Sequence, residues 1–463
     1  MISTYRYLNP FTKSSPIFYP SASHSEIQQT IEKSYKAYFQ YSNTSIEYRK
    51  TNLLTLSSLI EKNLEKLATL ISEDMGKPIT QAKGEVRKSA FQCKFFAENL
   101  ESLLHKTILF CPPAKSYIKY EPIGPLYFIM PWNYPIWLPI KAGIPALALG
   151  NTIILKPAPN VPRSTFALQE LMDLSGFRNG EFQTLLAEES QTEDIIKDSR
   201  IAGASVTGSV KTGKIIAKLA GENLKRFCLE LGGSDPFIVL EDADLTNVAK
   251  MGAIGRLDNA GQVCDAAKRF IILENVYSEF VDKLMNEVMK FNIGDPLDPS
   301  VTLGPMARED IIKTLKNQIK TTIRMGAKVV YGNKAQIEEG FSDNGNFFNP
   351  MILENVPLNS PGAREEIFGP TFILFKVKTH EEAIRLANDT NFGLGATIWS
   401  QDISKAQSIA NQINSGMVAI NTMINSDPRL PFGGTKNSGI GKECGISGFK
   451  TFALEKTIVI NEN

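Results

Sequence analysis

Histidine and cysteine are scarce in this chain of 463 residues. Three histidines leave little material for a histidine-rich metal site or a Ser–His–Asp triad. The cysteines are odd in number, widely spaced and without a CxxC pair, which argues against a zinc cluster or a disulfide framework. We therefore expect no bound metal and a reducing compartment, the cytoplasm. The five cysteines are Cys93, Cys111, Cys228, Cys264 and Cys444.

The chain also lacks net charge and uninterrupted apolar runs. Lysine and arginine number 50 against 49 aspartates and glutamates, a net charge of +1, which supplies no field for nucleic acid or an anionic membrane. The first residues contain no apolar segment of a signal peptide. Four prolines and Asn133 interrupt the most apolar stretch, 124–140, and a lipid-facing helix tolerates such breaks badly. We expect no nucleic-acid partner and no membrane span, and we predict a buried strand and a tight turn there.

The first hundred residues show helical patterns. Over 23–105, apolar residues recur at the four-residue spacing of a buried helix face. Ser23 with Glu26, and Thr44 with Glu47, are typical of capping boxes. Gly76 before Lys-Pro predicts a helix end.

Beyond residue 115, short β-rich runs alternate with helical segments such as 214–226 and 277–291. This alternation predicts an α/β protein with parallel sheets, and the length predicts about three domains. The predicted strands are 126–130, 152–155, 201–206, 237–240, 270–273, 328–331, 371–377 and 417–421.

One segment imitates a phosphate-binding loop. Residues 208–214 read GSVKTGK and fit GxxxxGK, but Ile215 follows where the motif needs Ser or Thr to hold magnesium. A P-loop nucleotide-binding protein is therefore a distant alternative. A glycine-containing turn that enters a helix still suits a pyrophosphate. No GxGxxG fingerprint of an ordinary dinucleotide site is present.

Three polar residues stand in patterns that suit catalysis. Cys264 follows a Gly-Gln-Val turn and is a candidate nucleophile. Glu230 lies between leucines before two glycines, where a raised pKa suits a general base. Asn133 lies between prolines and is a candidate oxyanion donor. A buried cysteine, an ion-paired glutamate and a turn-capping asparagine remain the alternatives for these segments alone.

Together the segments resemble the aldehyde dehydrogenase superfamily over nearly the whole chain. Within it, 233–240 and 261–272 look most like bacterial NAD(P)-dependent succinate-semialdehyde dehydrogenases. The matching segments occur in the order of that family and are 131–135, 156–157, 207–209, 230–233, 261–264, 366–370 and 431–434.

The resemblance implies an aldehyde dehydrogenase-like fold with three parts. A Rossmann-like cofactor domain would comprise 1–104 and 123–231. An α/β catalytic domain would comprise 232–444, and a β-flap for oligomerisation 105–122 and 445–463. Flap strands leave edges that need a partner, so a homodimer or homotetramer is expected.

The resemblance also implies a mechanism. Cys264 attacks the aldehyde, while the Asn133 side chain and the Cys264 N–H hold the oxyanion. Hydride transfer to NAD or NADP leaves a thioester, which water activated by Glu230 hydrolyses. The residues implied to contact the cofactor are Trp132, Lys156, Pro159, Gly208, Ser209, Leu231, Glu366 and Phe368.

Two departures from the family pattern affect specificity. Pro159 stands where NAD-selective relatives often carry a glutamate, so we predict dual use of the two cofactors or a preference for NADP. For succinate semialdehyde, the expected substrate, Lys141 and Arg429 are the candidate cations for the distal carboxylate. Asp258 stands where some such enzymes use arginine, and Asp265 adjoins the nucleophile. Another small aliphatic aldehyde or semialdehyde is the alternative substrate.

Overall fold

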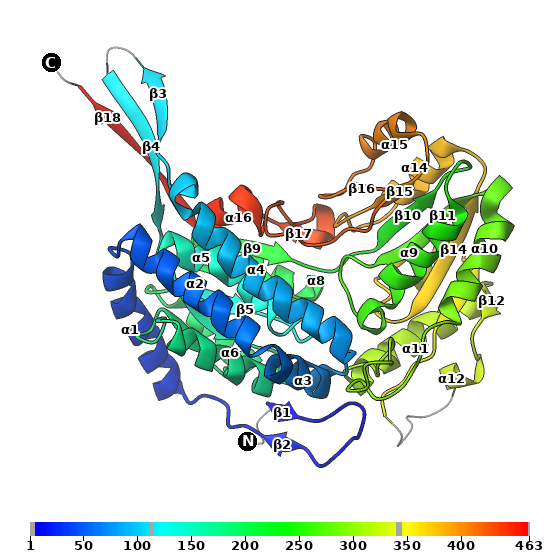
Figure 1. Ribbon diagram of the computed structural model, residues 1–463, viewed down its shortest axis with the longest axis horizontal. Helices are drawn as coiled ribbons and strands as arrows, with labels where there is room; N and C mark the ends of the chain where they lie inside the picture. The colour runs from blue at the N-terminus through cyan, green and yellow to red at the C-terminus, as the bar shows by residue number, and fades with distance from the viewer. Residues whose placement is uncertain (1–4, 112–113, 339–344, 462–463) are drawn as a thin grey trace.

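Two sheets flanked by helices, and a projecting flap, make up the computed structural model, which describes residues 5–111, 114–338 and 345–461 (Figure 1). The first four residues of the chain, and 112–113 and 462–463 of the predicted flap, lie outside the described residues. Within the described ranges, no helix is long and apolar enough to cross a membrane.

The first sheet has the order β17-β9-β8-β5-β6-β7. Strands β9, β8, β5, β6 and β7 are parallel. Their central strand, β5, is the first of them in the sequence, as in Rossmann-like folds. β17 adds an antiparallel edge, Gly439 opposite Glu230. The strands are β5 (Pro125–Ile129), β6 (Thr152–Lys156), β7 (Phe182–Thr184), β8 (Gly203–Thr207), β9 (Arg226–Glu230) and β17 (Gly439–Ile440).

Helices of the first half of the chain pack around this sheet (Figure 1). They bury apolar faces in two clusters that also contain strand residues: α2 to α6 contribute to one, and α1, α7 and α8 to the other. They are α1 (His24–Tyr41), α2 (Ile46–Lys62), α3 (Leu64–Met75), α4 (Ile79–Leu103), α5 (Trp137–Leu149), α6 (Pro162–Leu174), α7 (Thr192–Lys197) and α8 (Val210–Glu222), with the short hairpin β1 (Arg6–Tyr7) and β2 (Ile17–Phe18) before them and η1 (Glu189–Gln191) before α7.

The predicted helix signals had mixed outcomes. Ser23 and Glu26 form the predicted capping box, and Gly76 ends α3 at φ 82°. The second predicted box is wrong by one residue. Ser45 caps α2 by accepting a hydrogen bond from the Tyr48 N–H, while the Thr44 hydroxyl donates to the preceding helix.

The second sheet has the order β12-β13-β14-β11-β10-β15-β16, with only its β12–β13 pair antiparallel. It forms its own core. The strands are β10 (Asp235–Val239), β11 (Ala267–Leu273), β12 (Lys328–Tyr331), β13 (Met351–Glu354), β14 (Thr371–Val377), β15 (Thr397–Trp399) and β16 (Ala419–Ile420). The helical elements of this half are α9 (Leu245–Leu257), η2 (Asp258–Gly261), α10 (Glu274–Val288), α11 (Glu309–Arg324), α12 (Ala335–Glu338), α13 (Pro361–Arg364), α14 (His380–Asn388) and α15 (Ile403–Ala410).

The predicted strands lie in these sheets, with small shifts at their ends. The predicted helix 214–226 ends early, because Arg226 already begins β9. The stretch 124–140 contains the predicted strand and turn, and then enters α5 at Trp137. Strands β7, β9, β13, β15 and β17 of these sheets were absent from the prediction; four of them have at most four residues, too short for a distinct periodic signal.

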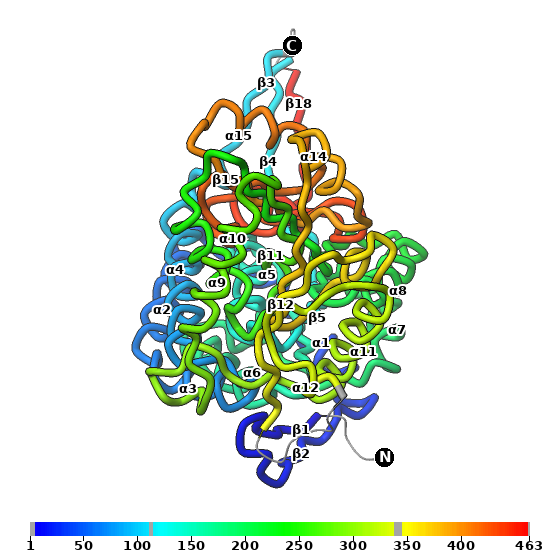
Figure 2. Tube along the Cα trace, turned by 90° about the vertical axis from the view of Figure 1, so that its right-hand side faces the viewer, coloured from blue at the N-terminus to red at the C-terminus, as the bar shows by residue number. Residues whose placement is uncertain are grey.

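The flap is a three-stranded antiparallel sheet that projects away from both bodies (Figures 1 and 2). It contains β3 (Thr107–Cys111), β4 (Ala114–Pro122) and β18 (Ala453–Ile460). In the chain, β18 follows η3 (Lys436–Ser438) and α16 (Gly445–Thr451). Ile108 and Phe110 on its edge strand are 82% and 93% exposed. The domain boundaries remain predictions, and β17, from the stretch assigned to the catalytic domain, pairs with the first sheet.

Candidate active site

Cys264 lies in the loop between η2 and β11, after a turn of unusual backbone shape. Asn259, Ala260 and Gly261 have φ values of 49°, 54° and 73°. At Gly261 an added Cβ would lie 2.4 Å from the carbonyl oxygen of Gly369, so this turn requires glycine. The surrounding structure must hold two non-glycine residues in this sparsely populated conformation.

Fully buried Arg256 ties this turn to the loop before β14. Its guanidinium donates hydrogen bonds to the carbonyl oxygens of Ile367 at 2.5 Å and Thr371 at 2.8 Å, and to Gly369. Burial lowers the pKa of Arg256 to about 9. The arginine therefore serves as an internal clamp for backbone carbonyls, and it fixes the loop that carries the nucleophile.

The Cys264 thiol lies among acidic and basic side chains. Its Sγ lies 3.9 Å from Asp265 Oδ1. Burial raises the pKa of Cys264 well above its usual value and Asp265 raises it further, while Lys141 and Lys268 act in the opposite direction. The structure thus shows that Asp265 acts on the thiol, a point that the sequence leaves open.

Asn133 lies beside this loop, in the turn between β5 and α5. Its Nδ2 donates to the Gln262 carbonyl at 3.0 Å, and its own carbonyl accepts a hydrogen bond from Asn259 Nδ2 at 3.0 Å. The amide nitrogen carries a second N–H. Asn133 is therefore oriented by groups that flank Cys264, as an oxyanion donor must be.

Glu230 is the last residue of β9 and is 2% exposed. Neither carboxylate oxygen has a hydrogen-bond partner within the described part of the chain. Burial raises the pKa of Glu230 well above its usual value, and nearby Glu443 adds to the shift while Lys141 and Lys442 oppose it. An unpartnered buried carboxyl is rare, and groups with strongly shifted pKa values gather at functional sites.

Lys141, the first candidate for the distal carboxylate, is buried against another acid. Its Nζ lies 2.7 Å from Glu443 Oε2 and 4.0 Å from the centroid of the Phe432 ring. Burial alone lowers the pKa of Lys141, but Glu443 and Glu230 hold it above its usual value. Its charge is therefore already paired inside the protein.

The other two predicted substrate residues are also engaged. Arg429 lies on an exposed loop and binds Asp427 through two nitrogens, at 2.8 and 2.7 Å. Asp258 Oδ2 accepts a hydrogen bond from the Tyr134 hydroxyl at 2.7 Å. The Lys77 ammonium, which is paired with Glu85, lies 3.4 Å from the centroid of the Tyr134 ring.

Glu366 and Phe368 approach the nucleophile from the loop before β14. Glu366 Oε1 accepts a hydrogen bond from the Gly233 N–H at 3.1 Å and lies 3.5 Å from Lys268 Nζ. Phe368 meets Trp132 edge to face, with ring centroids 6.0 Å apart. These predicted cofactor residues are thus gathered at one place.

Sequence reasoning missed Lys268, which is 1% exposed. Its ammonium donates to the carbonyl oxygens of Cys264 at 2.6 Å and Val263 at 2.9 Å. It therefore joins the nucleophile loop to Glu366. Two adjacent basic residues, Lys268 and Arg269, at the start of an apolar run were the available signal, because buried charges need partners.

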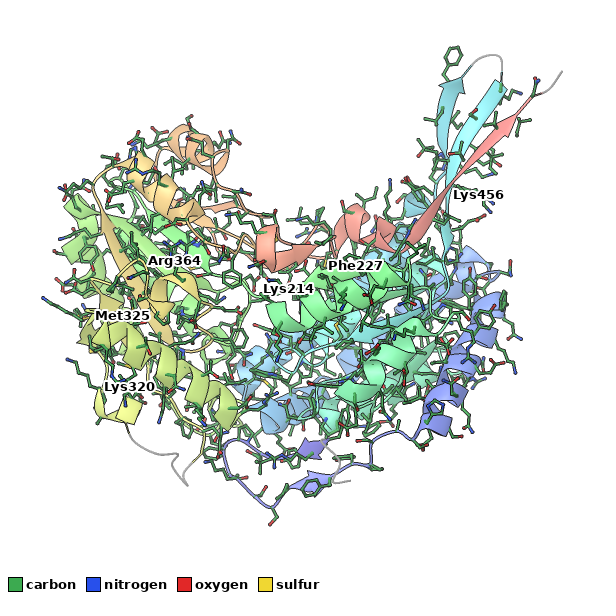
Figure 3. All side chains as sticks on the ribbon, turned by 180° about the vertical axis from the view of Figure 1, so that it is seen from behind. Lys214, Phe227, Lys320, Met325, Arg364 and Lys456 are labelled. Carbon is green, nitrogen blue, oxygen red and sulfur yellow. The ribbon has the colours of Figure 1, made fainter. Side chains whose placement is uncertain are left out.

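At the start of α8, Ser209 caps the helix by accepting a hydrogen bond from the Thr212 N–H at 3.1 Å. An added Cβ on Gly208 would meet no atom within 4 Å, so space is open beside this turn. Leu231 packs against Gly213, where an added Cβ would lie 2.5 Å from Leu231 Cδ1. Lys214 is exposed on α8 (Figure 3).

A cavity of about 1500 Å³ opens at the carboxyl ends of β6 and β7. Lys156, Pro159, Glu188 and Glu189 line it, and so does Arg6, whose backbone N–H donates to the Pro159 carbonyl at 2.9 Å. Burial lowers the pKa of Lys156, while Glu189 and Glu188 oppose that shift. Two carboxylates therefore accompany Lys156, which the sequence alone does not reveal.

Comparison with known proteins gives consistent matches over the whole length. The aldehyde dehydrogenase family model matches residues 2–458. A probable succinate-semialdehyde dehydrogenase [NADP(+)] of Synechocystis sp. is 38% identical over 453 residues, covering 98% of this chain and 99% of its own. The succinate semialdehyde dehydrogenase [NAD(P)+] Sad of Escherichia coli is 38% identical over 451 residues, covering 97% and 96%.

Solved structures agree. A succinic semialdehyde dehydrogenase from Streptococcus pyogenes, in complex with NADP⁺, is 34% identical and has a TM-score of 0.95, covering 98% of this chain and 99% of that one. This likeness confirms the predicted aldehyde dehydrogenase-like α/β fold.

Proposed function

The chain belongs to the aldehyde dehydrogenase family, and from this premise we propose that it oxidises succinate semialdehyde to succinate with NAD or NADP. The observation that carries the proposal is the grouping of a thiol, an oriented amide and a buried carboxyl without a partner: Cys264, Asn133 and Glu230. The names of the relatives support the choice of substrate and cofactor.

The residues present fit a nicotinamide dinucleotide. The cavity beside Lys156 has room for an adenosine ribose, and the open space at Gly208 adjoins the start of α8, where N–H groups favour a pyrophosphate. Glu366 and Phe368 would hold the nicotinamide ribose and ring. When bound, the nicotinamide supplies the hydride acceptor for the oxidation.

The first chemical step forms a bond between Cys264 Sγ and the aldehyde carbon after the thiol has passed its proton to a water molecule. The carbonyl oxygen becomes an oxyanion, which the second N–H of Asn133 and the Cys264 N–H stabilise. Loss of hydride with its two electrons leaves a thioester on Cys264.

Glu230 carries the second step. As a carboxylate it takes a proton from water, which attacks the thioester, and the C–S bond breaks to release the acid and the Cys264 thiolate. Burial keeps water away from the Glu230 carboxylate. Because the charged form is then poorly solvated, the pKa of Glu230 is raised and the carboxylate is a stronger base.

We also propose that the flap joins subunits into a homodimer or homotetramer, because its edge strand exposes Ile108 and Phe110. The described cysteines, Cys93, Cys228, Cys264 and Cys444, are free thiols. This usage supports a reducing, cytoplasmic location.

The test is a panel of aldehydes, including succinate semialdehyde and butanal, supplied with NAD or NADP and followed at the absorbance band of the reduced nicotinamide. Reduction with succinate semialdehyde preferred over butanal is the expected result. No reduction of either nucleotide by any aldehyde would contradict the proposed function.

A further inference from the structure

Lys88, on α4, is a half-buried lysine held by a loop from the far end of the chain. Its ammonium donates hydrogen bonds to Asn425 Oδ1 at 2.6 Å and to Ser426 Oγ at 2.7 Å. It also lies 4.6 Å from the centroid of the Trp137 ring. Three elements that are distant in sequence therefore fix the position of this cation.

Lys88 lies on the helix that holds the turn of Asn133. Glu85, one turn before Lys88 on α4, accepts hydrogen bonds from the N–H groups of Ile136 and Trp137 at 2.9 and 3.0 Å. After burial, the charge of Asp265, the neighbour of Cys264, has the largest influence on the Lys88 pKa. Unlike Lys141 and Arg429, whose charges are paired with Glu443 and Asp427, Lys88 forms no ion pair with a carboxylate of the described residues. Its charge is available to a ligand.

The hydrogen bonds around Ser426 leave two donors without an acceptor. Ser426 is 7% exposed, and its hydroxyl oxygen accepts from Lys88 Nζ and from Trp137 Nε1, the latter at 3.1 Å. Both nitrogens can only donate, so both lone pairs of the hydroxyl are used and its own O–H is left to donate. Lys88 has three N–H groups, of which Asn425 and Ser426 take two.

We propose that the Lys88 ammonium and the Ser426 hydroxyl form the subsite for the distal carboxylate of the aldehyde substrate. The two spare donors, one charged, match the two oxygens of a carboxylate. The inference rests on the proposed function and deepens it, because it moves substrate selection from Lys141 and Arg429 to a residue on α4. Trp137 shields one side of the cation and positions the hydroxyl.

The charge of this subsite depends on pH. Burial lowers the pKa of Lys88 to about 8, and Lys141 adds to this, while Asp265, Cys444 and Asp258 oppose it. Asp427, whose pKa the Lys88 charge lowers, is the remaining acid nearby and is bound to Arg429. The ammonium is present below about pH 8 and is lost above it. The KM for succinate semialdehyde should therefore rise above pH 8, whereas the KM for butanal has no such cause to rise.

The test compares Lys88→Met, Lys88→Arg and Ser426→Ala with the wild type on succinate semialdehyde and butanal. Removal of a charged hydrogen bond predicts a KM for succinate semialdehyde raised roughly 10- to 100-fold by Lys88→Met, and a smaller rise by Ser426→Ala. For Lys88→Met, the factor by which kcat/KM falls should be at least about ten times larger for succinate semialdehyde than for butanal. Arg87→Met is the matched control, because Arg87 is the exposed neighbour on the same helix, and it should behave as wild type.

Lys88→Arg provides the second readout. Arginine keeps its charge at high pH, so this variant should retain binding at pH 7 and lose the rise in KM above pH 8. Equal losses on both aldehydes, or no loss on either, would overturn the subsite. Calorimetry of succinate binding to the wild type and to Lys88→Met tests the subsite without any turnover. An enzyme that oxidises no aldehyde but binds succinate through Lys88 would therefore contradict only the proposed function.

Discussion

The inner and outer regions of the candidate site are built differently. The inner region consists of Cys264, Glu230 and Asn133. Asn133 is oriented by the Gln262 carbonyl, Glu230 is buried, and Cys264 is partly buried. The outer region is the cavity beside Lys156, whose walls carry charged side chains such as Glu189 from separate segments.

We expect the inner region to determine the reaction rate and the outer region to determine the cofactor preference. Groups held in fixed positions beside the reacting atoms each change the rate by orders of magnitude. Charges at an accessible wall are screened by water and by salt, so they shift preferences by smaller factors. Substitutions in the two regions should therefore differ in size and in the kinetic constant they change.

The largest effect is expected for Cys264→Ser. A serine hydroxyl at this position is a far weaker nucleophile than a thiolate, so turnover should fall on the order of 10⁴-fold or more. The measurement is the rate of nicotinamide reduction, with mass spectrometry of iodoacetamide-treated protein to locate the reactive thiol. Cys93→Ala is the control, because Cys93 is buried in α4. Comparable losses in both variants would remove Cys264 from its role.

Glu230→Gln should give the next largest loss, roughly 10³-fold in steady-state turnover, because glutamine cannot take a proton from water. Thioester formation should survive, so rapid mixing should show a burst of one reduced nicotinamide per site before the slow phase. Because burial raises the pKa of Glu230, its base form increases as pH rises, and so should wild-type deacylation. A variant with no burst, or with the wild-type pH profile, would contradict this role.

Asn133→Ala should lower kcat roughly 10²-fold, the usual cost of one oxyanion donor. The KM for the aldehyde should change little, since the oxyanion exists only after attack. Asn133→Gln tests position, because its longer side chain keeps the amide but moves it. A loss seen mainly in KM would assign Asn133 to ground-state binding and weaken the contrast between the two regions.

The residues of the inner region were proposed through the family resemblance, because each stands in a short motif of that family. Taken alone, the three segments leave structural alternatives open. Contacts between residues far apart in the sequence could not be predicted. Lys141 pairs with Glu443, and Glu189 approaches Lys156, across long separations in sequence that only the fold brings together. The same limit explains Lys268, whose carbonyl partners depend on a loop of unusual backbone shape.

Local signals failed at the shortest strands and at helix boundaries. The helix cap at Ser45 instead of Thr44 is a shift of one residue, because both side chains have a hydroxyl and only the backbone geometry decides between them. The paired sheets and their parallel order followed from alternation of strands and helices, which is a property of long stretches.

The smallest effect is expected for Glu189→Gln in the outer region. The sequence predicts dual use or an NADP preference from Pro159, but Glu189 lines the same cavity and its charge acts on Lys156. A carboxylate there opposes a 2′-phosphate, so its removal should raise kcat/KM for NADP relative to NAD about three- to tenfold. The gain should shrink as salt is added. Glu193→Gln is the control, because Glu193 is exposed on α7 and paired with Lys197. An unchanged ratio, or an equal shift in the control, would show that Pro159 and Lys156 set the preference without the acidic wall.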